Sequence, residues 1–320
     1  MSIYNKIYDF CKVKNKGGCH QNGSTPSPRV LFLIELLKSE GIEYELDEFI
    51  SNNLNNYWNK PDDKEPNKFY NIILRGKSNR MVVAHHDIVN PNSDNANDNS
   101  ASVINCISIK KQRPDINVVL LDGEESGGIG SNRLGKQISE GEFGKIEWVL
   151  NLELTGKGGS HFFIGQYPGK LNDKIVSIFN CPIVSTPYND AVTLRRYGID
   201  STVINPLPPL PKKPDDLEEE IEENDDVEFD FDDDFEDMYI GRFKKFKSFK
   251  NQNIIKKAKK SVSNFFKSDP YTSPVKTSDG IYLNYNLLYN CHSMNDSVST
   301  IDPKDMKEFV ENIVLKILDS

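Results

Sequence analysis

The sequence predicts a single α/β domain with a mixed central sheet and helices on both faces of that sheet. Short runs rich in β-branched residues alternate with longer runs whose apolar residues recur at helical spacing. This alternation is typical of strands that are joined by covering helices. The chain has 320 residues, of which 37% are hydrophobic, and this is enough to form a sizeable core.

The first half of the chain supplies a helix followed by several strands. After Ser27, the stretch PRVLFLIELLKSEG has apolar residues at helical spacing and stops at a glycine. IEYELDEF then alternates as a half-buried strand does, and FYNIILRG and RMVVAHHD are short, β-branched strands. A helical pattern over 99–111 leads into the buried strand INVVLLDGEE.

The second half continues the alternation and closes on a helix. SNRLGKQIS is a predicted helix and IEWVLNLEL a strand; LNDKIVSIFN and NDAVTLRRYG are helices, and DSTVINP is a strand. The final helix is DPKDMKEFVENIVLKIL. Asp302 is its expected N-cap and Pro303 its first residue, because proline is well tolerated at that position.

A charged, proline-led block over 207–275 interrupts this pattern. It carries 16 acidic residues between Asp215 and Asp237 and 10 basic ones between Arg242 and Lys267. Such a block cannot bury enough apolar surface to fold alone, so we interpret it as an insertion that is disordered. The chain then divides into an N-terminal extension (1–26), a main domain (27–206 and 276–320) and this insertion.

Within the insertion, residues 242–266 have apolar residues at intervals of three or four with lysines between them. This pattern fits a basic amphipathic helix that binds weakly to an anionic surface or a partner. The simpler interpretation, which we favour, is a solvated linker whose charges pair with the acidic tract. Outside the insertion the charges are nearly balanced, although the net charge is -9. We therefore expect no nucleic-acid partner.

The start of the chain carries no export signal, and no apolar run approaches the ~20 residues that span a bilayer. The five cysteines are an odd, scattered set, which suits reduced thiols better than a disulfide framework. We accordingly expect a cytoplasmic protein. The oligomeric state is not predictable from these features.

Chemically active residues gather where three predicted strands end: AHHD at 84–87, DGEE at 122–125 and NLE at 151–153. The carboxyl ends of strands in an open α/β sheet form the crevice where sites are built, so these side chains can converge. Converging carboxylates are costly unless a cation neutralises them. Histidine with carboxylate suits zinc, and a shared carboxylate suits a pair of zinc ions.

Five segments in order, AHHD, NANDNSAS, DGEESGGIGS, LNLELTG and CHSMNDSVSTID, resemble the signature segments of the aminopeptidase Y family of co-catalytic zinc peptidases. The resemblance runs from Pro28 to the final helix and excludes the insertion. It implies a zinc-exopeptidase-type domain and two zinc ions per chain. The metal ligands that it implies are His85, Asp98, Glu125, Glu153 and His292.

The resemblance also assigns roles within this set. Asp98 matches the aspartate that bridges both metals, and Asp87 the carboxylate that orients His85. Glu124 matches the general base, which takes a proton from water and passes it to the leaving amine. Glu153 stands where the family usually has aspartate, a departure that resembles the related aminoacylase and carboxypeptidase family.

Each residue also has a structural interpretation. His85 could be a strand-end histidine with satisfied hydrogen bonds, and Asp98 could cap the next helix. Glu124 and Glu125 could form a solvated turn. His86 is expected to take no part, and Cys291 occupies the place of a tyrosine that supports the oxyanion in the family; Tyr282, Tyr285 or Tyr289 could replace it.

The favoured function is removal of the N-terminal residue from a peptide. The alternatives are a carboxypeptidase or an amidohydrolase of small acylated amino acids, a one-zinc glutaminyl-cyclase-like transferase, and a non-catalytic binding module on the same fold. A peptidase fold that has become a non-catalytic binding module has normally lost metal ligands. In this sequence every ligand position still carries a residue that can bind zinc, and the position of the base still carries a glutamate. The substrate's side-chain preference is not legible from the sequence.

Overall fold

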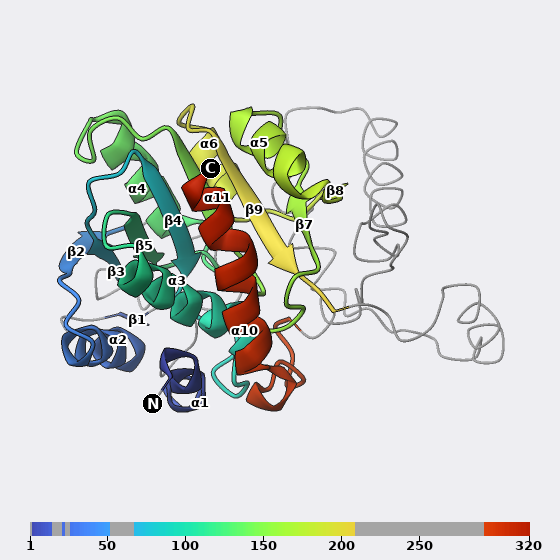
Figure 1. The fold of residues 1–320 in the computed structure, drawn as a ribbon. Coiled ribbons are helices and arrows are strands. Elements are labelled where there is room, and N and C mark those ends of the chain that lie inside the picture. The colour runs from blue at the N-terminus through green and yellow to red at the C-terminus, as the bar shows by residue number, and fades with distance from the viewer. Residues whose placement is uncertain (1, 15–20, 23–25, 52–66, 209–290) are drawn as a thin grey trace, which may run out of the picture.

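The computed structural model describes residues 2–14, 21–22, 26–51, 67–208 and 291–320, and its centre is a nine-stranded mixed sheet (Figure 1). In chain order the strands are β1 (Gln21–Asn22), β2 (Glu45–Ile50), β3 (Asn67–Leu74), β4 (Arg80–His85), β5 (Asn117–Leu121), β6 (Trp148–Leu152), β7 (Phe162–Gly165), β8 (Ile183–Val184) and β9 (Ser201–Pro206).

The strands lie in the order β1-β3-β5-β4-β6-β9-β7-β8, and β2 pairs with β3. The centre of the sheet is parallel, because β4 pairs in parallel with both β5 and β6, and β6 pairs in parallel with β9. Antiparallel pairs flank it, β3 with β5 and β7 with β9. The predicted mixed α/β sheet is confirmed.

The α-helices are α1 (Ile7–Phe10), α2 (Pro28–Ser39), α3 (Ala101–Gln112), α4 (Ile129–Ser139), α5 (Lys170–Phe179), α6 (Asp190–Arg195), α10 (Pro303–Phe309) and α11 (Leu315–Asp319). Shorter helical segments are η1 (Ile3–Lys6), η2 (Ala96–Ser100), η4 (Val298–Thr300) and η5 (Val310–Val314). Since α10, η5 and α11 follow one another without a break, they form the predicted closing helix.

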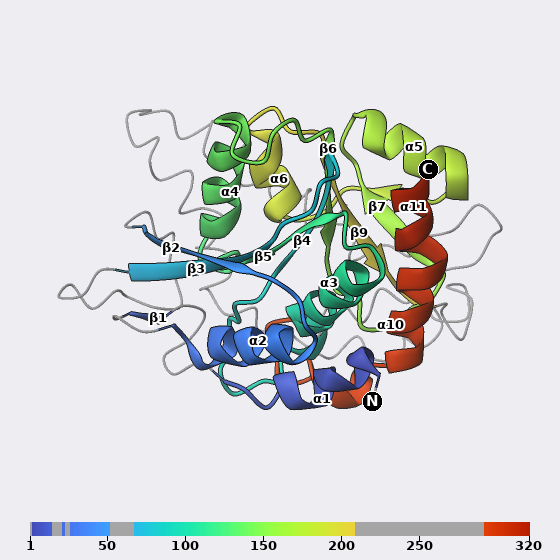
Figure 2. The same cartoon turned by 60° about the vertical axis from the view of Figure 1, so that its left-hand side comes forward.

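The helices cover both faces of the sheet. One face carries α1, α2, α3, α5, α10 and α11, and the other carries α4 and α6 (Figure 2). Alternate residues of β4 face opposite layers: Val82 and Ala84 lie in the first core, and Met81 and Val83 in the second. Central strands that are buried on both faces therefore have continuous apolar sequences, as MVVA in β4 does.

Two helix starts follow from local chemistry. Asp302 accepts a hydrogen bond from the amide of Lys304 at 2.8 Å, with Pro303 as the first helical residue, which confirms the predicted cap. The Ser27 hydroxyl likewise accepts from the amide of Val30 at 3.2 Å, and Pro28 follows it. Both caps satisfy amides that a helix leaves free at its first turn.

The N-terminal residues 2–14 pack against the main domain. Ile7 and Phe10 are fully buried in the core that α3 also lines, and the Tyr4 hydroxyl accepts a hydrogen bond from Ser108 at 2.8 Å. The guanidinium of Arg29 lies 3.9 Å from the centroid of the Phe10 ring. Residues 2–14 thus contribute to the same core as the residues after Ser27.

Three short strands were not predicted, β1, β7 and β8, because each has too few residues to show a period of two. The insertion from residue 209 onward lies outside the described residues. Among the helices of the described part, none combines the length and apolar character that crossing a membrane requires.

Candidate metal centre

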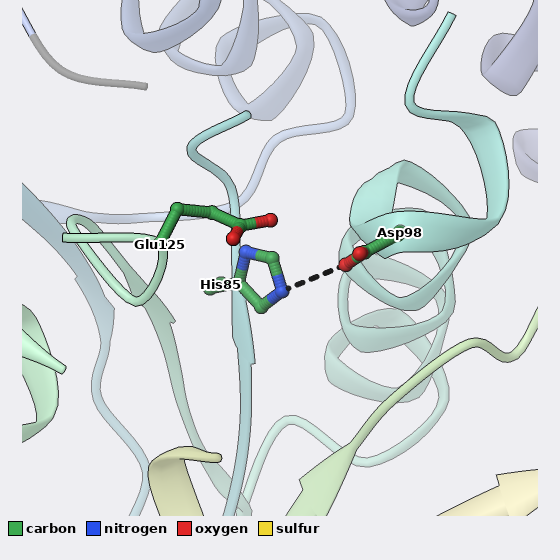
Figure 3. A group of neighbouring side chains, drawn as sticks. All are labelled: His85, Asp98 and Glu125. Atoms are coloured by element: carbon green, nitrogen blue, oxygen red, sulfur yellow. Dashed lines mark ion pairs between the residues drawn. The ribbon is translucent and has the colours of Figure 1, made fainter. Parts of the chain in front are cut away.

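Parallel strands bring three of the predicted segments to one edge of the sheet. His85 is the last residue of β4, Glu124 and Glu125 follow the end of β5, and Glu153 follows β6 directly. Because these three strands are neighbours and run in the same direction, their carboxyl ends meet. Asp98 comes from η2 at the start of α3, and Figure 3 shows it close to His85, with Glu125 beside them.

Asp98 lies between two histidines, and each of its oxygens faces one of them. Its Oδ1 is 3.2 Å from Nε2 of His85, and its Oδ2 is 3.1 Å from Nε2 of His292. Each histidine has a second carboxylate of its own, since Glu153 Oε2 is 3.5 Å from His85 Nε2 and Glu125 Oε2 is 3.3 Å from His292 Nε2.

We call His85, Glu153 and Asp98 Oδ1 together the His85 half of the centre, and His292, Glu125 and Asp98 Oδ2 the His292 half. The two halves share one carboxylate and otherwise use different residues. Donor atoms of His85, Asp98 and Glu125 all lie within 4.8 Å of one another, which is the spacing of groups that could hold a metal ion.

The His85 half therefore consists of His85, Glu153 and Asp98 Oδ1, and both of its own side chains come from the ends of sheet strands. Asp87 supports this half from behind, because its Oδ1 lies 3.3 Å from Nδ1 of His85. The same carboxylate accepts hydrogen bonds from the amides of Glu124 at 3.2 Å and Glu125 at 3.1 Å. Asp87 thus ties the histidine to the turn that carries both glutamates.

The turn after β5 depends on glycine at two places. Gly123 has a φ of 75°, and a Cβ there would lie 2.8 Å from the ring of Phe69. Gly128 has a φ of 71°, and a Cβ there would meet Thr193 and Tyr188 at 2.7 Å. Residues other than glycine rarely adopt this conformation, so the glycines of the sequence DGEESGG allow the tight turn that presents the two glutamates.

Carboxylates set the protonation of both histidines in the metal-free protein. Burial opposes a charged imidazole at His85, but the carboxylates around it, led by Glu153, outweigh burial and hold its pKa well above the ordinary value. Glu125, with Asp98, likewise raises the pKa of His292 well above its ordinary value. Burial alone would raise the pKa of Asp98, yet the two histidines outweigh it and lower that pKa.

Glu124 lies beside the two halves. Burial raises its pKa well above the ordinary value; His85 opposes this shift, while Glu125 and Asp190 add to it. A carboxylate with a raised pKa is a better proton acceptor at neutral pH than an ordinary glutamate. Glu124 is therefore a candidate general base.

The residues present fit zinc. Imidazole nitrogen and carboxylate oxygen are its common ligands, and a buried group of carboxylates needs a cation for charge balance. Asp98 can serve two ions because each of its oxygens faces a different histidine. The His85 half could hold one ion and the His292 half another.

Several residues around the centre were not predicted from the sequence. Asp296 accepts hydrogen bonds from the amides of Asn97 at 2.7 Å and Asp98 at 3.0 Å. Asn99 and Asn151 donate to the Glu153 carboxylate. Isolated asparagines and aspartates are common in loops and strand ends, so the available signal was only their position beside the signature segments.

Two further expectations concern neighbours of the centre. The Nε2–H of His86 donates a hydrogen bond to the Tyr70 carbonyl at 2.9 Å, and burial lowers the pKa of His86 to about 4, so it stays neutral and apart from the two halves. Cys291 is a free thiol next to His292. The three tyrosines that could replace the family's oxyanion support, Tyr282, Tyr285 and Tyr289, lie outside the described residues.

Solved structures with a similar fold include both aminopeptidases and glutaminyl cyclases. The aminopeptidase from Aneurinibacillus sp. strain AM-1 is 10% identical, with a TM-score of 0.56 over 99% of this chain and 92% of that one. Porphyromonas gingivalis glutaminyl cyclase is 16% identical, with a TM-score of 0.56 over 99% of this chain and 96% of that one. At these identities the likeness concerns the fold alone.

The zinc aminopeptidase from Bacillus subtilis matches 81% of this chain at 16% identity and a TM-score of 0.48, and the chain spans only 51% of that protein. No curated protein matches the chain. Over residues 71–193, which carry all the candidate metal ligands except His292, the chain matches the family model described as Peptidase family M28.

Proposed function

We propose that this protein is a zinc-dependent exopeptidase that removes the N-terminal residue from peptides. One observation carries the proposal: the two oxygens of Asp98 face different histidines, and each histidine has its own second carboxylate. A shared carboxylate between two matched sets of ligands is the arrangement that a pair of zinc ions requires. The match of residues 71–193 to Peptidase family M28 supports a metallopeptidase.

In this proposal His85, Asp98 and Glu153 hold one zinc ion, and His292, Asp98 and Glu125 hold the other. Bound zinc lowers the pKa of water and polarises a substrate carbonyl as a Lewis acid. The histidines then bind as neutral imidazoles, so metal binding displaces the protons that the surrounding carboxylates favour in the metal-free protein.

Glu124 is the proposed general base. It takes a proton from the attacking water and delivers it to the leaving amine, and its carboxylate lies beside both halves without belonging to either set of ligands. Asp87 is a positioning residue in this scheme. It holds the amide groups of Glu124 and Glu125 and lies 3.3 Å from His85, so one carboxylate aligns the base with both halves.

The choice of aminopeptidase rests on chemistry: a pair of zinc ions can anchor a free amine while polarising the adjacent carbonyl. The resemblance of the five signature segments to the aminopeptidase Y family supports it. Within the same site, a carboxypeptidase or an amidohydrolase of small acylated amino acids would use the same base. We propose a peptide as the substrate ahead of an acylated amino acid.

A glutaminyl-cyclase-like transferase is the second candidate, since the Porphyromonas gingivalis cyclase has the same TM-score as the Aneurinibacillus aminopeptidase and covers slightly more of its own length. Such an enzyme would need one zinc ion, held by one half; in the case of the His292 half, the His85 half would bind no metal. His85 and Glu153 would then hydrogen-bond to each other and to Asp98 without binding metal.

A substrate panel tests the proposal. Zinc-loaded protein is incubated with aminoacyl-arylamides, N-blocked peptides, N-acyl amino acids and a peptide that begins with glutamine. We expect release of the N-terminal residue from free peptides and arylamides, with Glu124→Gln as the inactive control. Cyclisation of the glutamine peptide without release of an amino acid would favour the transferase, and cleavage only of N-acyl amino acids would favour the amidohydrolase.

A further inference from the structure

Two asparagines hold the Glu153 carboxylate. Asn151 Nδ2 donates to Glu153 Oε1 at 3.1 Å, and Asn99 Nδ2 donates to Glu153 Oε2 at 2.7 Å. An ionised carboxylate accepts hydrogen bonds and cannot donate them, so both asparagines must turn their NH2 groups toward it. Each oxygen of Glu153 therefore receives one amide donor.

Asn151 has an unusual location for a polar side chain. It is fully buried within β6, at the parallel centre of the sheet, where a polar group is costly unless it is hydrogen-bonded. Glu153 is its hydrogen-bond acceptor there, and its own Oδ1 has no hydrogen-bond partner among the described residues. The bond to Glu153 is thus the feature of the described structure that accounts for an amide at this position.

Asn99 reaches the same carboxylate from the other side of the centre. It is fully buried and follows Asp98 in the chain. Its Nδ2 also donates to the Leu152 carbonyl at 3.0 Å, and its Oδ1 accepts from the Leu154 amide at 3.2 Å. Asn99 therefore holds the backbone on both sides of Glu153 and links it to the residue that both halves share.

These contacts leave one oxygen directed at the metal position. Oε1 of Glu153 is turned to Asn151. Oε2 accepts the bond from Asn99 with one lone pair and lies 3.5 Å from Nε2 of His85, so its other lone pair is available to an ion that joins both residues. Glutamate is one methylene longer than the aspartate that the family resemblance leads us to expect here. Its carboxylate therefore needs lateral support to keep a fixed position.

We propose that Asn99 and Asn151 are positioning residues that adapt the His85 half to a glutamate and limit Glu153 to one donor oxygen. This inference rests on the proposed two-zinc function. Family resemblance alone would lead us to expect that aspartate at position 153 binds zinc at least as well as glutamate. The inference predicts the opposite: Glu153→Asp weakens zinc binding, because the shorter side chain withdraws from both amides and from His85.

The test measures zinc affinity of the full-length protein by competition with a chelator, and the absorption spectrum of the cobalt-substituted protein at one and two equivalents. The variants are Asn151→Ala, Asn99→Ala and Glu153→Asp. Asn117→Ala is the matched control. Asn117 is also a buried strand asparagine with two hydrogen bonds, to Gly76 and Ser78, but it lies at the start of β5, away from the strand ends that carry the metal centre.

We expect each of the three variants to lower the binding affinity for one of the two zinc ions by about 10- to 100-fold, as loss of an outer hydrogen bond to a metal ligand does. We also expect each variant to alter the absorption spectrum of cobalt bound at that position. The control lowers thermal stability without changing either affinity. In the double variant Glu153→Asp with Asn151→Ala, the second change adds little, since the contact is already lost.

Two outcomes overturn the inference: zinc affinities of Asn151→Ala and Asn99→Ala no different from those of Asn117→Ala, or tighter zinc binding by Glu153→Asp. If Asn151→Ala does not fold, Glu153→Asp and Asn99→Ala still decide the question through the same titration. A wild-type protein that binds a single ion contradicts the proposed function instead, so the two failures are distinguishable.

Discussion

The two halves of the centre share Asp98 but are built differently. The side chain of His85 is 2% exposed and sits at the end of a central strand, whereas the side chain of His292 is 38% exposed and lies in an irregular segment with a φ of 64°. The strand fixes His85 through the sheet and the core. His292 instead reaches Asp98 from outside, so the two halves are positioned by different physical forces.

Hydrogen bonds position the segment that carries His292, whereas the sheet positions His85. The Asp296 carboxylate binds the amides of Asn97 and Asp98, and Asp94 in turn accepts from the amide of Val298 at 2.9 Å and the Ser297 hydroxyl at 3.2 Å. These reciprocal bonds join the segment around His292 to the segment before α3. The comparison teaches that one half is part of the folding core and the other is attached to it.

The largest expected effect comes from a residue that belongs to neither half. Glu124→Gln should reduce turnover by about 10²- to 10⁴-fold, because it removes the proton acceptor and no ligand. Zinc content, measured by elemental analysis, should stay at the wild-type value. Retention of most of the activity would mean that another residue is the base.

The next effect separates the two halves directly. In the metal-free protein, His85→Ala should lower the free energy of unfolding by about 3 kcal/mol, because it leaves Glu153 and Asp98 buried without their partner. His292→Ala should cost less, about 1–2 kcal/mol: it also leaves Glu125 and Asp98 without a partner, but water can enter the place of that partly exposed imidazole and screen them.

Urea denaturation of both variants with chelator present measures this difference. Equal losses of stability would show that burial does not distinguish the halves. A larger loss for His292→Ala would reverse the comparison.

The fold and the candidate site were predictable to different depths. Short β-branched and apolar runs revealed β3, β4, β5 and β6, and apolar residues at helical spacing revealed the helices between them. Parallel strands place their ends together, so convergence of His85 with Glu153 could be expected. The exchange of hydrogen bonds between Asp296, Asn97 and Asp98 could not. It joins residues about 200 positions apart through backbone amides, which leave no pattern in the sequence.

Arg29 supports the backbone of the His85 half, and its replacement is the next test. Its buried guanidinium donates to the His86 carbonyl at 2.9 Å, the Ser100 hydroxyl at 2.9 Å and the Val13 carbonyl at 3.2 Å. Arg29→Met should lower the free energy of unfolding by about 2 kcal/mol, because those acceptors are left without a donor. It should also weaken zinc binding, since it frees the backbone next to His85.

Thermal unfolding and zinc titration of Arg29→Met check this expectation. Arg113→Met is the control, because Arg113 forms its ion pairs at the surface, with Asp115 and Asp319. The same loss of zinc affinity in both variants would remove Arg29 from the support of this half.

The smallest effect depends on pH. Burial raises the pKa of Asp190 to about 7, whereas an unfolded aspartate has a pKa of about 3.9. Between pH 4 and 7 the unfolded chain releases this proton and the folded chain keeps it, so the carboxyl lowers stability progressively as the pH rises, and the cost levels off above pH 7. Asp190→Asn removes that cost.

We therefore expect the metal-free Asp190→Asn variant to match wild type near pH 4 and to exceed it by about 1–2 kcal/mol at pH 8. Asp296→Asn is the comparison for the other half, because burial also raises the pKa of Asp296 to about 7, but its carboxylate accepts two backbone hydrogen bonds that an amide can only partly replace. A gain of stability in Asp296→Asn equal to that in Asp190→Asn would show that those bonds contribute little.

Anomalous diffraction from zinc-loaded crystals is the most direct test of the two-half centre. We predict two zinc ions about 3.5–4 Å apart, one bound by His85, Glu153 and Asp98 Oδ1 and the other by His292, Glu125 and Asp98 Oδ2. A single ion in the His292 half, with His85 hydrogen-bonded to Glu153 at full zinc saturation, would contradict this arrangement and favour one-zinc chemistry.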